Sequence, residues 1–461
     1  MVVKIAVLNG SPKGEVSVTM QYVHFLEQRF PETEFKLYDV ALKIKKLEKD
    51  NQAFQDVLAG VAAADAVLWA FPLYFLVVCS QYKRFIELIF EKNAVSAFRG
   101  KPAASLSTSI NFFDYTAHNY IHAVCDDLEM RYFGSYSAEM NDLLKTAERR
   151  RLKAFGTLFL KAIKERTPFI RSHPPLKMPD VVFEAEKTAP VETAGKKVLI
   201  IADNLSGNSN LQKMVERLRQ SFSPEAEVVQ LIDVDIKGGC LGCIRCGMDN
   251  RCVYDDRDGF RQFFNARIKT ADILFIAGAV RDRYLSALWK CFFDRSFFNG
   301  HTPFLKDKQM GFVISGPLNQ MYHLREIFEA SVGFQRAGML GFVSDDAGSS
   351  SEINAALQVM AANAVARSQL GYIPPPTFYQ VAGTKLFRDV IWGRLRPVFQ
   401  ADHRYYKEHG MYNFPQTYYK WWMINSTLVL LTKIPAFRRE FFKRIKNEMI
   451  KPAANALKRT E

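Results

Sequence analysis

The sequence predicts an α/β protein with two tandem, doubly wound parallel-sheet domains, followed by a basic, aromatic-rich helical C-terminal extension. A Val/Ile-rich strand, a polar turn and an amphipathic helix open the chain over residues 4–30, and the same order returns after Gly195. Residues 64–89 align without a gap on residues 271–296, at a constant offset of 207 residues. Two copies of one unit explain this match. Strands that alternate with helices form a parallel sheet covered on both faces.

The repeat sets the predicted domain boundaries. A chain of 461 residues exceeds the roughly 250 residues at which single cores stop growing. Between the copies lies a stretch with five prolines and no helical period, which predicts an extended linker. We expect a first domain over residues 1–165, the linker over 166–195, a second domain over 196–368 and the extension over 369–461.

Charge is concentrated in the extension. Residues 380–461 hold 16 Lys and Arg against 6 Asp and Glu, which accounts for most of the net charge of +14. The two α/β units are therefore only mildly basic, which argues against nucleic acid as a partner. The first residues enter a strand without the features of a signal peptide, so we expect a cytoplasmic protein. Thiols stay reduced there, so the seven cysteines do not predict disulfides.

The turn NGSPKGEVSVT, residues 9–19, separates the first strand from the first helix. Its hydroxyls, on Ser11, Ser17 and Thr19, lie beside the free backbone N–H groups of a helix N-terminus, an arrangement that binds phosphate. The alternative is that these residues only cap the helix. Neither the P-loop pattern nor G-x-G-x-x-G occurs in the chain, so a Rossmann dinucleotide site is not expected.

This turn, followed by FPLYF and KRFIELI, resembles the flavodoxin-like NADPH-dependent FMN reductases. The resemblance implies FMN as cofactor and NAD(P)H as a co-substrate, with three loops around the flavin at the carboxyl ends of the strands. It implies the following residues: Ser11, Lys13, Ser17, Val18 and Thr19 for the phosphate; Pro72, Leu73, Tyr74 and Phe75 for the isoalloxazine ring; and Ser107, Thr108, Ser109 and Asn111 in a third loop.

Four cysteines lie within thirteen residues, in the spacing C-x2-C-x2-C-x5-C. Structural zinc usually takes its ligands from two separated knuckles, whereas iron-sulfur loops place several cysteines on one short segment. The spacing predicts a [4Fe-4S] cluster, with zinc or free thiols as alternatives. The ligands would be Cys240, Cys243, Cys246 and Cys252.

The motif, its following CVYDD and its place after the second strand of the second unit resemble the iron-sulfur flavoproteins. These proteins are oligomers in which cluster and flavin communicate between subunits, so the resemblance implies a homo-oligomer. The first copy keeps the phosphate turn without the cysteines. The second copy has Ala279 and Arg281 where the first has Pro72 and Tyr74. We expect one FMN in the first copy, and a second FMN near Ser206, Asn208, Ser209 and Asn210 stays open.

In the extension, the apolar stretch Trp421 to Leu431 is far shorter than the ~20 residues that span a bilayer. Further on, Phe437, Phe441, Ile445 and Met449 share one face of a basic helix. Two interpretations stay open. Residues 415–451 attach peripherally to an anionic membrane at its inner face, or these helices pack on the α/β units or on a partner chain.

These features predict an oxidoreductase that passes electrons between a [4Fe-4S] cluster and FMN. NAD(P)H or ferredoxin would be the donor, and a quinone, a nitro compound, another small molecule or a redox protein the acceptor. The alternatives are a non-catalytic electron carrier and, more weakly, a zinc-stabilised interaction protein. His118 follows the third loop. One interpretation is that it steers a proton to the flavin or the substrate; we expect instead that it lies at the surface or in a helix cap.

Overall fold

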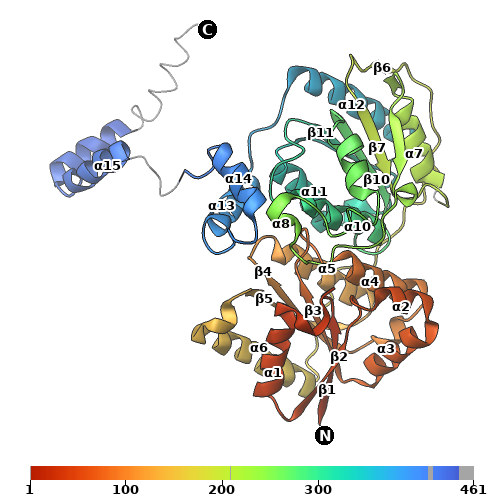
Figure 1. The fold of residues 1–461 in the computed structure, drawn as a ribbon, viewed down its shortest axis with the longest axis vertical. Coiled ribbons are helices and arrows are strands. Elements are labelled where there is room, and N and C mark those ends of the chain that lie inside the picture. The colour runs from red at the N-terminus through yellow and green to blue at the C-terminus, as the bar shows by residue number, and fades with distance from the viewer. Residues whose placement is uncertain (1, 208, 414–418, 446–461) are drawn as a thin grey trace. The chain divides into compact units, whose positions relative to one another are not determined.

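The computed structural model describes residues 2–207, 209–413 and 419–445. The chain divides into two compact units, residues 1–404 and 405–461. The first unit holds two α/β domains, an extended segment between them and the first helices of the C-terminal extension (Figure 1).

The first domain is built on a five-stranded sheet in the order β2-β1-β3-β4-β5, with every neighbouring pair parallel. Central strands such as β3 are buried on both faces, as their apolar sequences require. The strands are β1 (Val3–Asn9), β2 (Thr33–Tyr38), β3 (Ala66–Pro72), β4 (Pro102–Ser109) and β5 (Arg131–Glu139). This is the flavodoxin-like strand order.

Helices cover both faces of this sheet. Hydrophobic side chains of α1 and α6 pack on one face, and those of α2 to α5 pack on the other. The helices are α1 (Val18–Arg29), α2 (Ile44–Lys49), α3 (Asn51–Ala63), α4 (Ser80–Glu91), α5 (Asp114–Asp127) and α6 (Thr146–Lys164).

The second domain repeats the arrangement, with parallel strands in the order β9-β7-β10-β11-β12. The 207-residue offset found in the sequence also relates the observed strands. The strands β3 and β4 begin at Ala66 and Pro102, and their equivalents β10 and β11 begin at Ile273 and Gln309. The strands are β7 (Val198–Ala202), β9 (Glu227–Gln230), β10 (Ile273–Ala279), β11 (Gln309–Ser315) and β12 (Gly338–Ser344), and β6 (Val191–Glu192) pairs separately with β8 (Phe222–Ser223). The predicted tandem of doubly wound domains is confirmed.

Helices also cover both faces of the second sheet. Side chains of α7 and α12 pack on one face, and those of α10 and α11 belong to the cluster on the other. Between β9 and β10 the chain carries the cysteine segment and two short helices. The helices are α7 (Ser209–Arg219), α8 (Cys246–Asp249), α9 (Phe260–Phe263), α10 (Ala287–Arg295), α11 (Tyr322–Phe334) and α12 (Ser350–Leu370).

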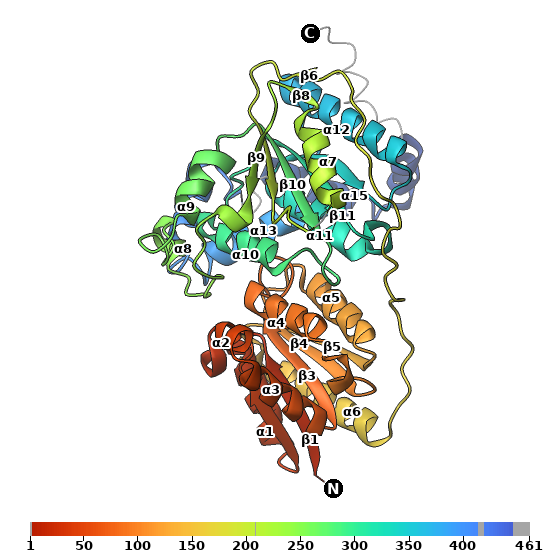
Figure 2. The ribbon, with the colours of Figure 1, turned by 90° about the vertical axis from the view of Figure 1, so that its right-hand side faces the viewer.

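The two domains meet through α4 and α5 on one side and α10 and α11 on the other (Figures 1 and 2). One hydrophobic cluster runs through both domains at this contact. Within it, Phe75 of the first domain stacks on Phe293 of the second, with ring centroids 5.4 Å apart and nearly parallel planes. The carboxyl-end loops of the first sheet are therefore held against the second domain.

The segment between the domains is extended; its first part contacts α5 of the first domain, and its later part lies on the second domain. Phe183 is fully buried in the core beside α7 and α12. Asn354 of α12 accepts a hydrogen bond from the Glu186 backbone nitrogen and donates one to the Glu184 carbonyl. The predicted boundaries of this linker and of the domains stay predictions.

Residues after α12 form helices α13 (Phe378–Trp392), α14 (Gln400–Glu408) and α15 (Tyr419–Leu431), which confirms the predicted helical C-terminal region. Phe387 of α13 packs against Phe334 of α11 and Phe112 of the first domain. Part of the extension thus completes the first unit. Within the described residues, no helix is long and apolar enough to cross a bilayer.

Candidate functional site

A cavity of about 360 Å³ lies where the carboxyl ends of β1, β3 and β4 face the second domain. Its walls include all four cysteines of the motif. They also include all but two of the thirteen predicted flavin-site residues, the exceptions being Ser107 and Asn111. Segments that are far apart in the sequence thus meet at one chamber.

The first turn forms a pre-shaped helix start. Ser17 is the N-cap of α1, and its hydroxyl accepts a hydrogen bond from the Met20 nitrogen at 3.3 Å. The Ser11 hydroxyl accepts one from the Lys13 nitrogen at 3.2 Å. The capping interpretation therefore holds for Ser17. It does not exclude a phosphate, because a cap satisfies only part of the free N–H groups at a helix start.

A hydroxyl pair joins two of the predicted flavin loops. Thr19 in the first turn of α1 and Thr108 at the end of β4 are both buried, and their side-chain oxygens lie 2.7 Å apart. Both residues line the cavity. Since parallel strands end at one edge of a sheet, two loops distant in sequence form one polar patch there.

The loop after β3 turns sharply towards the second domain. Tyr74 and Val77 exchange backbone hydrogen bonds of 2.8 and 3.1 Å, and Phe75 and Leu76 between them have positive φ angles of 39° and 68°. Positive φ is costly for non-glycine residues and persists where the surroundings hold it. Here the buried ammonium of Lys290 donates to the Tyr74 carbonyl at 3.0 Å.

The third loop is only partly as predicted. Thr108 and Ser109 line the cavity together with Ile110 and Phe112, which the sequence did not single out. Ser107 instead points into the domain, where its hydroxyl lies 2.8 Å from His118 Nε2.

His118 therefore lies neither at the surface nor in a helix cap, and the expectation from the sequence is wrong. It is buried, its Nδ1 pairs with the Ser105 hydroxyl at 2.7 Å, and its ring packs on Phe71. Burial lowers the pKa of His118 to about 4, which keeps the imidazole neutral at physiological pH. It is a satisfied core histidine.

The cysteine segment wraps against the first domain. Gly242 and Ile244 have positive φ angles of 62° and 60°, so the backbone turns between the cysteines. A Cβ at Gly242 would overlap the Tyr74 hydroxyl, which shows how closely the two loops approach. Gln81 of α4 donates to the Cys240 carbonyl at 3.0 Å.

Burial and a buried cation set the electrostatics around the thiols. Burial raises the pKa of the Cys240 thiol and raises that of Cys246 to about 12, so both are neutral thiols until a metal replaces the proton. Arg295 is almost fully buried beside this segment, donating to the Gly238 carbonyl at 3.0 Å and pairing with Asp258. Its guanidinium would offset the charge of thiolate ligands.

Among the described residues, the sulfurs of the cysteine segment do not come together as a site for a single ion. Within the described parts of the chain, three side chains bring their donor atoms close enough to share one ion: His122, Asp126 and His173. No cysteine is among them. A tetrahedral Zn²⁺ with Zn–S bonds of about 2.3 Å would need the sulfurs close together.

Sequence reasoning missed the other half of the chamber, which comes from the second domain and the extension. This wall is mainly apolar and aromatic: Phe297, Phe298, Phe304, Phe334, Phe387 and Phe399. Its polar member His301 stacks on Phe387 at 4.0 Å and lies 3.4 Å from the buried carboxylate of Asp402. No motif marks these residues, because only tertiary packing gathers them.

The corresponding place in the second domain is already filled by a carboxylate. Asp345 accepts hydrogen bonds from the Ser315 hydroxyl, the Gly316 nitrogen and the Asn210 amide at 2.7 to 3.0 Å. Asn210 also donates to the linker at Val181. A phosphate group bound at this place would be repelled by the Asp345 carboxylate. Asn208 and the Ser209 side chain, suggested for a second FMN, lie outside the described residues.

Comparison with known protein families decides the class. The family model for NADPH-dependent FMN reductase matches residues 3–139 and again residues 196–346. The chain belongs to the NADPH-dependent FMN reductase family. As a tandem member it carries the family unit twice, and family membership supports an FMN-dependent oxidoreductase.

Three of the solved structures that match this FMN reductase family member each cover about a third of its chain. An NADH:FMN oxidoreductase in its apo form is 16% identical, over 35% of this chain and 89% of that chain, with a TM-score of 0.30. FerB, a NAD(P)H:(acceptor) oxidoreductase from Paracoccus denitrificans, is 19% identical, over 36% and 98%, with a TM-score of 0.28. General stress protein 14 from Treponema denticola, in complex with FMN, is 11% identical, over 36% and 99%, with a TM-score of 0.27. A search of curated proteins found no match.

Proposed function

We propose that the chain is an iron-sulfur flavoprotein oxidoreductase, with FMN in the first domain and a [4Fe-4S] cluster on Cys240, Cys243, Cys246 and Cys252. The observation that supports it is the shared cavity, whose walls hold all four cysteines and all the predicted flavin residues except Ser107 and Asn111. NAD(P)H or ferredoxin would donate electrons. FMN supplies two-electron chemistry when bound, and the cluster supplies one-electron steps.

The chain's own groups suit these roles. The start of α1, capped by Ser17, would bind the phosphate dianion through its free N–H groups and its dipole. The strained turn at Tyr74 and Phe75 would position the ring next to the cysteine segment. Arg295 would hold a positive charge close to the thiolates.

The aromatic wall suggests the class of acceptor. Phe112, Phe334 and Phe387 pack edge to face or tilted around the chamber, and such rings bind planar apolar molecules by stacking. A quinone or a nitroaromatic compound fits this lining better than a highly charged substrate. His301, backed by Asp402, is a polar contact within reach of the chamber.

The full-length protein, purified without oxygen, tests the proposal. A flavin doublet together with a broad cluster shoulder, and stoichiometric iron and acid-labile sulfide, are expected. A colourless protein with stoichiometric zinc would instead favour the zinc-stabilised interaction protein. Steady turnover of NAD(P)H with a quinone or nitro acceptor separates an enzyme from an electron carrier, which would reduce its partner only stoichiometrically.

A further inference from the structure

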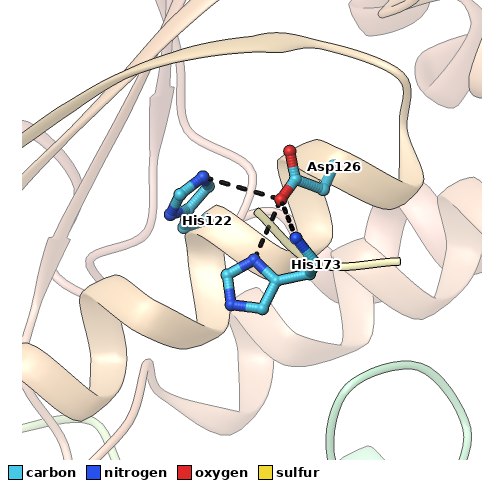
Figure 3. Close-up of side chains that lie close together, drawn as sticks. All are labelled: His122, Asp126 and His173. Carbon is cyan, nitrogen blue, oxygen red and sulfur yellow. Dashed lines mark hydrogen bonds and ion pairs between the residues drawn. The ribbon is translucent and has the colours of Figure 1, made fainter. Parts of the chain in front are cut away.

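Two histidines and a carboxylate converge at the C-terminal end of α5 (Figure 3). Asp126 Oδ2 lies 2.9 Å from His173 Nδ1 and 3.5 Å from His122 Nε2. His122 and Asp126 lie one helical turn apart on α5, whereas His173 comes from the extended segment between the domains. Neither the flavin chamber nor the cysteine segment includes any of the three.

The three side chains are held in place by groups around them. The backbone nitrogens of Ser172 and His173 both donate to Asp126 Oδ2, at 3.1 and 2.9 Å. The His122 ring stacks on Tyr132 with centroids 4.2 Å apart. The two imidazoles stand nearly perpendicular, with centroids 4.8 Å apart. Metal ligands are typically oriented by such outer contacts.

The donor atoms match one kind of ion. Two imidazole nitrogens and a carboxylate oxygen are the ligand types of Zn²⁺, whose bonds to them measure about 2.0–2.2 Å. A tetrahedron with such bonds places its ligand atoms about 3.3 Å apart, and the observed 2.9 and 3.5 Å bracket this value. We propose that His122, Asp126 and His173 form a binding site for a divalent transition-metal ion such as Zn²⁺, with water in the remaining position.

The cluster can exchange an ion with solvent. The side chains of His122 and His173 are 23% and 26% exposed, while that of Asp126 is 3% exposed. On binding, the metal replaces the hydrogen bond between His173 Nδ1 and Asp126 Oδ2, and the ligating ring carries its proton on Nε2.

The position of the site gives the ion a structural role. The adjacent Asp127 forms a two-pronged ion pair of 2.6 Å with Arg283 of the second domain, and Arg283 also donates to the Pro174 carbonyl at 2.7 Å. First domain, linker and second domain therefore meet within a few residues of the ligands. A bound ion fixes the linker to α5 beside this contact.

Titration of the chelator-treated, full-length protein tests the site, with Zn²⁺ for affinity and Co²⁺ for ligand type. We expect the Co²⁺ ion bound at this site to show visible d–d bands and no thiolate charge-transfer band. Co²⁺ bound to the cysteines would show that charge-transfer band, so the spectrum distinguishes the two sites. His122→Gln should weaken Zn²⁺ binding about 100-fold or more, since even outer-shell changes cost 10–100-fold. Asp126→Asn should do the same.

His24→Gln is the matched control, because His24 pairs with the Glu27 carboxylate at 2.7 Å on another helix. His122→Gln keeps the backbone bonds to Asp126, so its fold stays testable by melting temperature without metal. Equal Zn²⁺ affinity in His122→Gln and wild type, or a Co²⁺ equivalent with only thiolate bands, would overturn the proposal. Iron and flavin contents are measured in the same samples, so a failure here is distinct from a failure of the proposed function.

Discussion

The carboxylate of Glu87 in the first domain accepts a hydrogen bond from the backbone nitrogen of Ala287, 2.7 Å away at the start of α10. The reverse contact is also present, because Asp294 accepts from the Ser80 nitrogen at the start of α4, again at 2.7 Å. These acids and these helix starts are each related by the 207-residue offset. Each domain thus caps a helix of the other, and the interface is reciprocal.

Glu87→Gln should weaken this interface in a pH-dependent way. Burial opposes ionisation of Glu87, but Lys83, the Ala287 nitrogen and Arg84 outweigh it and hold the pKa of Glu87 below its ordinary 4.5. The ionised group therefore stabilises the fold above that pH, and the stabilisation is lost as pH falls through the lowered pKa. We expect a loss of about 2 kcal/mol in the free energy of unfolding at pH 7.

Denaturant unfolding at pH 7 and at acid pH measures this effect. The difference between Glu87→Gln and wild type should shrink at the lower pH. Glu165→Gln, which removes an exposed carboxylate at the end of α6, is the control and should change little. A difference that stays the same at both pH values would contradict the assignment.

Cys243→Ser should abolish the cluster and leave the flavin. Cys243 is one of the four predicted ligands, whereas the predicted FMN phosphate contacts lie in the first domain. Iron and acid-labile sulfide should fall toward zero while FMN per chain stays constant. Cys125→Ala, in the core of the first domain, is the control and should retain both. Joint loss of iron and flavin from Cys243→Ser would indicate that the two groups depend on one site.

Thr19→Val should weaken FMN binding. The substitution keeps the side-chain shape but removes the hydroxyl that pairs with Thr108 in the cavity wall. The proposed hydrogen bond from the Thr19 hydroxyl to the FMN phosphate cannot form with Val, and its loss is worth about 1.4 kcal/mol, or about tenfold in Kd. Fluorescence titration of the apoprotein with FMN measures this. Thr157→Val is the control, because the Thr157 hydroxyl donates to the Lys153 carbonyl on the exposed side of α6. This variant should bind FMN like wild type. Equal FMN affinity in Thr19→Val and Thr157→Val would argue against the first turn as the phosphate site.

Gly242→Ala should disturb communication between flavin and cluster. An added Cβ would strike the Tyr74 hydroxyl and crowd Lys13, so either the Tyr74 side chain or the cysteine segment must shift. We expect both cofactors to remain, while electron exchange between them slows by about tenfold or more in stopped-flow reduction. Gly100→Ala also carries positive φ but meets no neighbour, so its exchange rate should be unchanged. Unaltered kinetics in Gly242→Ala would count against adjacent cofactors.

The predicted membrane attachment of residues 415–451 is testable by sedimentation with vesicles. Residues 415–418 and 446–451, and the side chains of Lys420 and Trp421, lie outside the described residues. Nearby, Trp422 is 70% exposed and Phe442 59% exposed. We expect binding to phosphatidylglycerol vesicles at low salt, since each nearby Lys or Arg adds about 1 kcal/mol. Binding should fall at 1 M salt, where the Debye length is about 3 Å.

Trp422→Ala should reduce this vesicle binding, because an aromatic ring at the headgroup boundary contributes apolar contact. Phe378→Ala is a matched control, since Phe378 is an equally exposed aromatic outside the segment. Equal recovery in the supernatant with anionic and neutral vesicles would favour packing on protein instead.

The parts of the site that follow the chain closely were predictable. The strand-turn-helix pattern places Ser17 and Thr19 at one helix start, and the cysteine spacing is visible within thirteen residues. The 207-residue offset also makes Asp294 the equivalent of Glu87, but it does not reveal that each acid accepts from a helix start of the other domain. Local patterns survive folding because backbone geometry fixes which neighbouring residues share a face.

The parts that depend on packing were not predictable. Phe112, Phe334 and Phe387 come from three segments, and nothing in the spacing of phenylalanines says which will meet. His118 looked like a surface residue by its polarity, yet two serine hydroxyls satisfy it in the core. His173 lies 47 residues beyond Asp126, in a stretch whose sequence indicates only an extended backbone.

Joining both halves in one polypeptide changes how their reciprocal contact behaves. Two separate subunits would share these helix caps only above a threshold concentration, and every substitution would appear in both at once. Here the two halves are covalently linked, so dilution does not separate Glu87 from Ala287. Each half has also been free to change alone, and so Lys83 faces Asp282 whereas its counterpart Lys290 faces the carbonyl of Tyr74.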